Sequence, residues 1–275
     1  MNAMLQFRLL FDYLTLEENM PRKHILVTND DGVTAPGLFA LAKAMEEIGD
    51  VSVVAPDKNW SACGHVKTMH RPIMVRETTL EDGTPALMTD GAPSDCVALA
   101  LMGLVERPVD LVITGINPHA NLGDDVTYSG TVSSAMEGVI NGVPSIACSM
   151  QSKMDGVEPD YHAAAQYCVP IASKVLAEGL PKDIVLSVNI PYQPVVEVKG
   201  YKAALQGKRI YHDELLRFEG PKGKQMVWIG GSAPTAVSIE DSDYNVMMDG
   251  YVAVTPLQLN MTANHFISTL KDWEL

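Results

Sequence analysis

The sequence predicts an α/β protein, a doubly wound and mostly parallel sheet followed by a β-rich C-terminal extension. Strand-like and helix-like runs alternate between residues 22 and 190, which is typical of parallel β-α units packed in layers. After Pro191 the strand-like runs are separated by stretches without helical periodicity. Polar side chains also follow several of the apolar strands, so we expect a functional site where the strands end.

The first predicted unit is a strand over His24–Thr28 and a helix over Pro36–Ile48. The helix is indicated by apolar residues at helical spacing, and Pro36 lies near its start, where a missing N–H is harmless. Residues 58–90 are expected to form a loop and a hairpin. The remaining predicted strands are Val51–Ala55, Asp110–Thr114, Pro144–Ser149 and Ile184–Asn189, and the remaining predicted helices are Ser94–Leu104, Thr131–Asn141 and Tyr161–Glu178.

The C-terminal extension has three strand-like runs, Val195–Val198, Met226–Ile229 and Tyr251–Val254. Extended hairpins that no helix covers leave strand edges that proteins usually hide. We therefore expect an arm that packs on another subunit. The predicted organisation is an N-terminal extension over residues 1–21, a catalytic core over 22–190 and an oligomerisation extension over 191–275.

Composition and charge exclude several classes of function. No apolar run reaches the about 18 residues needed to span a bilayer, and residues 1–19 lack the basic start and apolar core of a secretory signal. The four scattered cysteines favour reduced thiols, and the cytoplasm is the expected compartment. The net charge of −14 without a basic stripe argues against duplex nucleic acid as a partner.

Two adjacent carboxylates, Asp30 and Asp31, follow the first predicted strand. In an open parallel sheet, ligands bind beyond the carboxyl ends of the strands. Neighbouring carboxylates repel each other unless a proton or a metal lies between them, and their oxygens suit a hard cation such as Mg²⁺ or Mn²⁺. The alternative is a polar turn that closes the strand, since Asp, Asn and Gly are ordinary turn residues.

Two further polar groups follow the strand predicted at Asp110–Thr114. Gly115, Asn117 and Asn121 come first, and Ser129-Gly130-Thr131 then opens a predicted helix. Free N–H groups and the positive end of a helix dipole favour a phosphate at such a start, and both hydroxyls can donate. The alternative is an ordinary helix cap, where Ser and Thr are favoured in any case.

Taken in order, these motifs resemble the SurE (stationary-phase survival protein) family of metal-dependent nucleotidases, over about residues 22 to 268. The ordered set is far more specific than any one of its members. The matching segments are Thr28–Val33 with Ala35–Gly37, Ala55–Asp57 with Asn59 and Ser61, Gly91–Val97, Gly115–Asn117 with Asn121–Gly123, Tyr128–Val132, and Thr255–Gln258.

The resemblance implies a Rossmann-like core and a cytoplasmic 5′-nucleotidase, a phosphoric monoester hydrolase acting on nucleoside monophosphates. It also implies one Mg²⁺ or Mn²⁺ per subunit, and a homodimer or homotetramer with exchanged C-terminal segments. The implied metal ligands are Asp30, Asp31, Ser61 and Asn117, and the implied phosphate pocket is Asn121, Ser129, Gly130 and Thr131.

The chain departs from the family pattern at three places. Ala62 and His119 stand where the family often has glycine, which could alter the shape of the pocket. The family usually starts just before the first strand, so residues 1–19 are expected to be an extension ahead of Met20.

The expected mechanism uses Asp30 and Asp31, with the metal neutralising charge on the phosphoryl oxygens. Attack by a metal-activated water and attack or base catalysis by Asp30 both stay open. His65 and His119 flank the expected site, so each is a candidate leaving-group acid or substrate contact. The alternative for each is a loop histidine without a catalytic role.

Two other classes of protein also have acidic residues after their first strand. A phosphoacceptor signalling domain needs a lysine near its last strand, which is missing here, and a nucleoside hydrolase would cut the N-glycosidic bond. The reaction product distinguishes a nucleotidase, which releases inorganic phosphate, from both alternatives. Variable loops, such as residues 58–67, and the C-terminal extension supply the contacts to base and sugar. These contacts set the preference for a 5′-nucleotide, a 3′-nucleotide or short polyphosphate.

Overall fold

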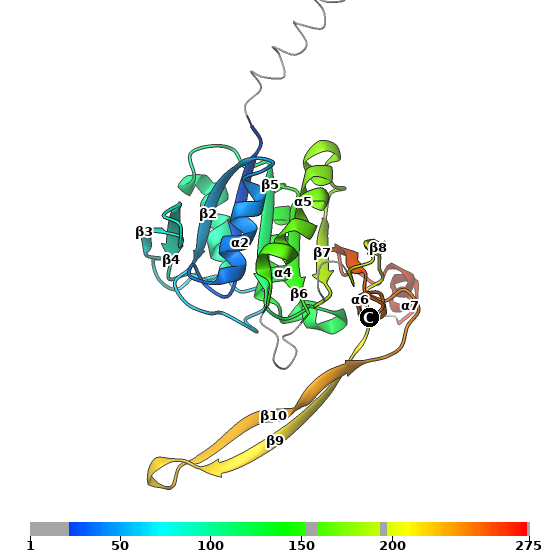
Figure 1. Ribbon diagram of the computed structural model, residues 1–275. Helices are drawn as coiled ribbons and strands as arrows, with labels where there is room; N and C mark the ends of the chain where they lie inside the picture. The colour runs from blue at the N-terminus through cyan, green and yellow to red at the C-terminus, as the bar shows by residue number, and fades with distance from the viewer. Residues whose placement is uncertain (1–21, 152–158, 193–196, 274–275) are drawn as a thin grey trace, which may run out of the picture.

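A nine-stranded sheet forms the centre of the molecule, in the order β3-β4-β2-β1-β5-β6-β7-β11-β8 (Figure 1). The computed structural model describes residues 22–151, 159–192 and 197–273. The strands of this sheet are β1 (His24–Thr28), β2 (Asp50–Pro56), β3 (Val75–Thr79), β4 (Pro85–Thr89), β5 (Leu111–Asn117), β6 (Ser145–Met150), β7 (Ile184–Ile190), β8 (Tyr201–Ala203) and β11 (Val252–Gln258).

The central strands β4, β2, β1, β5, β6 and β7 run parallel to one another. Strand β1 pairs with β2 on one side and with β5 on the other, so the chain order reverses between β1 and β5. Such a reversal is the topological switch point, where open α/β sheets bind their ligands. The register pairs Thr28 with Thr114, which brings the segments after β1 and β5 to the same edge.

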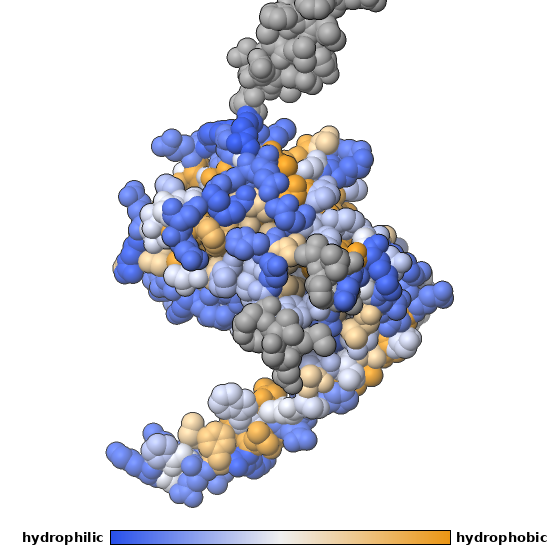
Figure 2. Space-filling view, viewed as in Figure 1, coloured by the Kyte–Doolittle hydropathy of each residue, from blue (hydrophilic) through white to orange (hydrophobic). Residues whose placement is uncertain are grey.

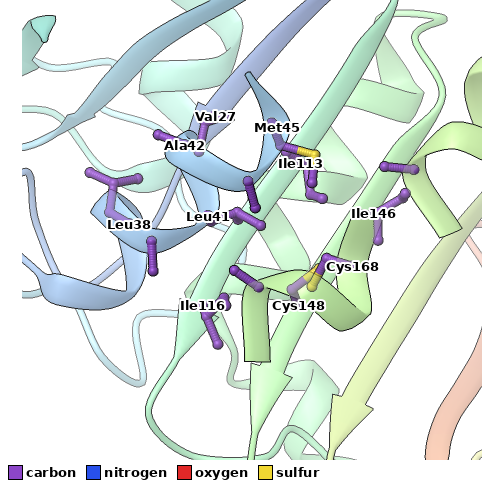
Figure 3. Close-up of a cluster of buried hydrophobic side chains, with 14 of the residues drawn as sticks. Val27, Leu38, Leu41, Ala42, Met45, Ile113, Ile116, Ile146, Cys148 and Cys168 are labelled. Carbon is purple, nitrogen blue, oxygen red and sulfur yellow. The ribbon is translucent and has the colours of Figure 1, made fainter. Parts of the chain in front are cut away.

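Helices cover both faces of the sheet. Leu38, Leu41 and Met45 of α2 (Pro36–Met45) pack with residues of α5 (Tyr161–Glu178) on one face, while Cys96 and Val97 of α3 (Pro93–Leu99) lie on the other. Figure 3 shows the first cluster, in which α2 side chains lie beside Ile113 of β5, and Cys168 of α5 lies beside Cys148 of β6. The helices are α2 (Pro36–Met45), α3 (Pro93–Leu99), α4 (Gly130–Ile140), α5 (Tyr161–Glu178), α6 (Asp243–Met248) and α7 (Ile267–Lys271), with one-turn helices at Ala100–Leu104, Gly123–Thr127, Pro221–Gly223 and Asn264–Phe266.

The predicted doubly wound α/β fold is confirmed. The helix predicted at Tyr161–Glu178 has the predicted bounds, and the hairpin expected within residues 58–90 is β3–β4. The helix predicted at Ser94–Leu104 is divided, because Gly103 adopts a positive φ of 113° and a π-type turn replaces the last part of the helix. No helix of the described residues combines the length and apolar character needed to cross a membrane.

The predicted boundary at residue 191 does not separate two sheets. Strand β11, predicted as part of the extension, pairs antiparallel with β7, and β8 pairs with β11, so both extend the main sheet. The strand predicted at Val195–Val198 lies partly outside the described residues, and Glu197 and Val198 are not in a strand. The extension also contains the short helices α6 and α7, which the sequence interpretation missed.

The separate β-structure of the extension is one long hairpin, β9 (Arg209–Glu219) with β10 (Gln225–Ala236). Figure 1 shows it projecting from the body of the protein. Its apolar side chains are exposed, with Trp228 at 65% and Ile229 at 76%. Figure 2 shows a hydrophobic area along the arm. An extended arm is therefore present between residues 209 and 236, and its packing on another subunit stays a prediction.

Candidate active site

The two carboxylates stand on a tight turn at the end of β1. The Asn29 side chain closes this turn, accepting a hydrogen bond from Gly32 N at 3.2 Å and donating to Gly32 O at 3.0 Å. Asn29 is fully buried and Asp30 is 3% exposed. The turn alternative is thus partly correct, but Asn29 forms the turn, which leaves Asp30 and Asp31 available for other contacts.

Asp30 is held by the start of α4. The Thr131 hydroxyl donates to Asp30 Oδ1 at 2.6 Å, and the backbone N–H groups of Gly130 and Thr131 also hydrogen bond to Asp30. Burial raises the pKa of Asp30 more strongly than these donors lower it. A Cβ atom on Gly130 would lie 2.7 Å from Asp30 Oδ2, so glycine permits this close approach.

Asp31 is the less constrained carboxylate of the pair. Asn59 Nδ2 donates to its Oδ1 at 3.2 Å, whereas Oδ2 is buried and has no hydrogen-bond partner among the described residues. Burial and the charge of Asp30 raise the pKa of Asp31 to about 7. A buried, unpartnered carboxylate oxygen beside a second carboxylate is the environment that a bound cation would stabilise.

Asn117 ends β5, the strand next to β1. Its Nδ2 donates to the backbone oxygen of His119, which orients the amide. Gly115 makes this strand end possible, because it adopts a φ of 123° and a Cβ there would lie 2.1 Å from Cys148 O. Because Thr28 pairs with Thr114, Asp31, which follows β1, and Asn117, which ends β5, lie at the same edge of the sheet.

Ser61 lies in the loop that follows β2. Its N–H donates to Asn59 Oδ1 at 2.7 Å, and Asn59 in turn contacts Asp31. Trp60 N also donates to Asp30 O at 2.7 Å. These contacts bring the loop to the carboxylates, and Ser61 is exposed there.

The donor set fits a hard divalent cation. No group of three or more His, Cys, Asp or Glu side chains that could hold a metal occurs among the described residues. Two carboxylates, with a hydroxyl from Ser61 and an amide oxygen from Asn117, would instead supply only oxygen ligands. Such ligands favour Mg²⁺ or Mn²⁺ over the softer metals that prefer thiolate or imidazole.

Three of the four residues expected at the phosphate, Ser129, Gly130 and Thr131, lie at the start of α4 and make different contacts there. Ser129 is the N-cap of α4, where its hydroxyl accepts from Val132 N at 3.0 Å, so the capping alternative describes its position. Thr131 is fully buried and donates to Asp30, as Gly130 does through its backbone. The start of α4 therefore already faces an anionic side chain of the protein itself.

Asn121 belongs to a buried polar group that the sequence interpretation missed. Its Nδ2 donates to Ser149 Oγ at 2.7 Å, and its N–H donates to Asn189 Oδ1 at 2.8 Å. Ser149 and Asn189 lie near the ends of β6 and β7 and are at most 1% exposed. The available signal was a polar residue near the end of each apolar strand, the same signal that identified Asp30 and Asn117.

The two candidate histidines have different surroundings. His65 Nε2 lies 3.1 Å from Oε2 of Glu137, a buried residue of α4. His119 supplies the backbone oxygen that orients Asn117. In this arrangement His65 faces a carboxylate of the protein, and its prediction as a substrate contact stays untested.

Sequence comparison relates the chain to proteins of known family. The family model described as survival protein SurE matches residues 25–213. The protein named 5′-nucleotidase SurE of Chloroflexus aggregans is 44% identical over 251 residues, covering 91% of this chain and 99% of the relative. The protein of the same name from Geobacter sulfurreducens is 43% identical, covering 92% and 94%.

A solved structure supports the same relationship. The crystal structure of the SurE protein from Aquifex aeolicus matches with a TM-score of 0.76 and 40% sequence identity. The match covers 92% of this chain and all of that one. The similarity therefore includes the strands that carry Asp30, Asp31 and Asn117 and much of the C-terminal extension.

Proposed function

Because the chain belongs to the survival protein SurE family, we propose that it is a 5′-nucleotidase, a metal-dependent phosphatase that hydrolyses nucleoside monophosphates to nucleoside and inorganic phosphate. The observation that carries this proposal is the pair Asp30 and Asp31 at the switch point, in which Asp30 is buried and the half-buried Asp31 has a buried Oδ2 with no partner among the described residues. A nucleoside hydrolase and a phosphoacceptor domain receive no support from the relatives.

Asp30, Asp31, Ser61 and Asn117 would hold the cation, which we propose to be one Mg²⁺ or Mn²⁺ per subunit. When bound, such a cation neutralises the charge that the transition state spreads over the phosphoryl oxygens. The arrangement that supports this assignment is the convergence of two strand ends and the loop after β2. The oxygen-only donor set is consistent with either metal.

The protein's own groups supply orientation and proton transfer. Thr131 and the first N–H groups of α4 hold Asp30 in one position, so that it could orient or deprotonate a nucleophile. Burial keeps water away from this carboxylate and makes its interactions stronger than they would be in water. Gly130 and Thr131 contact Asp30, and we propose that they line the phosphate pocket together with Asn121 and Ser129.

We also propose that the active form contains more than one chain and is cytoplasmic. The support for association is the β9–β10 hairpin, whose exposed apolar side chains need a cover such as a second copy of the chain. The proposed homodimer or homotetramer would include exchanged C-terminal segments. The support for the compartment is that Cys63, Cys96, Cys148 and Cys168 are all free thiols.

Phosphate release from a panel of 5′- and 3′-nucleoside monophosphates and short polyphosphate tests the activity. The native chain is assayed with Mg²⁺, with Mn²⁺ and with a chelator, and is compared with Asp30→Asn. We expect release from 5′-nucleotides that needs metal and is lost in the variant. Asp241→Asn, which changes an exposed carboxylate on another part of the surface, is the matched control. Metal binding without phosphate release from any member of the panel would contradict the proposal.

A further inference from the structure

The loop of residues 58–68, here called the crossing loop, passes from the carboxylates to the start of α4. At one end, Asn59 contacts Asp31 and Trp60 N donates to Asp30 O. Further along, Gly64 N donates to Tyr128 O at 2.9 Å, next to the N-cap of α4. One short segment therefore contacts both sides of the proposed metal site.

The second half of the crossing loop places two cationic or basic side chains on one buried carboxylate. Glu137 of α4 is 2% exposed. Lys67 Nζ lies 2.7 Å from its Oε1, and His65 Nε2 lies 3.1 Å from its Oε2. Asn141 Nδ2 also donates to Oε1 at 3.0 Å. Both oxygens of Glu137 are thus occupied, and two of the three partners come from the crossing loop.

A buried carboxylate binds such partners firmly, since losing them would leave a charge without water or a counter-ion. Glu137 lies about two turns along α4 from Gly130, and the intervening helix is a rigid spacer. Ser133 Oγ, on the same helix, donates to Gly64 O at 2.9 Å. The crossing loop is therefore attached to the same helix whose first residues hold Asp30.

The loop between these attachments is short. Only Ser61, Ala62 and Cys63 separate Trp60, bonded to Asp30, from Gly64, bonded to Tyr128. Ala62 adopts a positive φ of 59°, which an alanine rarely does without support from its surroundings. A shift of the loop at His65 and Lys67 would be transmitted through these few residues to Ser61 and Asn59.

We propose that Glu137 is a positioning residue for the metal site. It holds His65 and Lys67, and through them it keeps Asn59 and Ser61 against Asp31. The inference rests on the proposed function, because it assigns Ser61 and Asp31 to the cation. It also gives His65 a role in holding the crossing loop, which does not involve contact with the substrate.

The test measures Mn²⁺ affinity of the chelator-treated protein by titration, together with amide hydrogen exchange at Trp60 and Gly64. The variants are Glu137→Gln, which keeps the shape and removes the charge, and Lys67→Met, which removes the cation at a side chain that is 45% exposed. The control is Lys202→Met, which removes an exposed ion pair with Asp241. We expect each test variant to bind Mn²⁺ about 10-fold more weakly, as for other outer partners of metal ligands. Protection at both amides should fall, and the control should match the native chain.

A purely structural role for Glu137 predicts a different result. The midpoint of thermal unfolding would fall while Mn²⁺ affinity and the two protected amides stayed native, and this would overturn the inference. If Glu137→Gln does not fold, Lys67→Met alone decides, because its side chain reaches the surface.

Loss of Mn²⁺ binding in Asp31→Asn with native binding in both test variants would refute this inference and leave the nucleotidase proposal standing. A native chain that binds Mn²⁺ yet releases no phosphate would refute the nucleotidase proposal only.

Discussion

The edge of the sheet after β1 and β5 and the β9–β10 hairpin are built in opposite ways. At the edge, polar side chains are buried, with Asp30 at 3% exposed and Thr131 fully buried. On the hairpin, apolar side chains are exposed, with Trp228 at 65% and Ile229 at 76%. Burying a polar group and exposing an apolar surface both cost free energy unless something compensates. The partners proposed for the two regions differ accordingly, a cation at the edge and a protein surface at the hairpin.

The largest effect we expect is from Asp31→Asn, which removes the charge at the unpartnered oxygen. Mn²⁺ affinity should fall by more than about 100-fold, because even outer partners of a metal ligand contribute 10–100-fold. Titration of chelator-treated protein measures this loss. Asp110→Asn, a carboxylate at the opposite end of the strands that accepts from His24 N, is the control. Equal affinity in Asp31→Asn and the native chain would remove Asp31 from the site.

The next effect concerns the hydroxyl that holds Asp30. Thr131→Val keeps the shape of the side chain but removes the donor to Oδ1, so kcat/KM for a 5′-nucleotide should fall about 10–100-fold. Thr131→Ser keeps the hydroxyl and should stay much closer to the native rate. Steady-state kinetics at saturating metal separates the two variants. If valine and serine behave alike, the hydroxyl does not position Asp30 for catalysis.

The hairpin prediction concerns association. In the hairpin register, Leu215 opposes Ile229 and Leu216 opposes Trp228, so apolar pairs lie on both faces. The double variant Trp228→Lys with Ile229→Lys should lower the mass of the particle in sedimentation or light scattering. Mn²⁺ affinity should not change, because the proposed ligands all come from residues 30–117. The control is Glu214→Lys, which changes a polar position on the same hairpin. Native mass in the double variant would show that Trp228 and Ile229 do not hold the assembly together.

The smallest expected effect is a pH dependence of the metal-free protein. Burial raises the pKa of Asp31 in the folded protein to about 7, from an ordinary value of 3.8, so between these pH values the folded state keeps a proton that the unfolded state has lost. The contribution of Asp31 to stability is therefore present below about pH 4 and is lost as pH rises through about 7. Denaturant unfolding with chelator, at a series of pH values, should show a larger loss in the native chain than in Asp31→Asn, in which only the raised pKa of Asp30 remains. A saturating divalent cation should reverse it, by about 2.7 kcal/mol at 100 times its Kd.

Sequence reasoning predicted the strands of the edge better than it predicted their contacts. The pattern of apolar runs located β1, β5, β6 and β7 within a few residues, because both faces of these strands are buried. It did not reveal that Thr131 donates to Asp30, 101 residues away in the chain. Contacts of this kind depend on how helices are placed on the sheet, and a single sequence does not specify that placement.

The extension was predicted less accurately for a related reason. The run Tyr251–Val254 has a strand composition, but composition does not say which sheet it joins, and β11 pairs with β7. Glu137 was missed because one acidic residue in a helical pattern is usually solvent-exposed. Only the fold shows that Lys67 and His65 meet it in a buried position.

Anomalous scattering from crystals soaked in Mn²⁺ would locate the cation directly. We expect one peak per subunit beside Asp31 Oδ2, at about 2.2 Å from a carboxylate oxygen and within reach of Asp30 and Asn117. Crystals of Asp31→Asn should lose this peak. The absence of a peak at this edge, in crystals of protein that releases phosphate only when Mn²⁺ is added, would show that the cation acts elsewhere and would contradict the account.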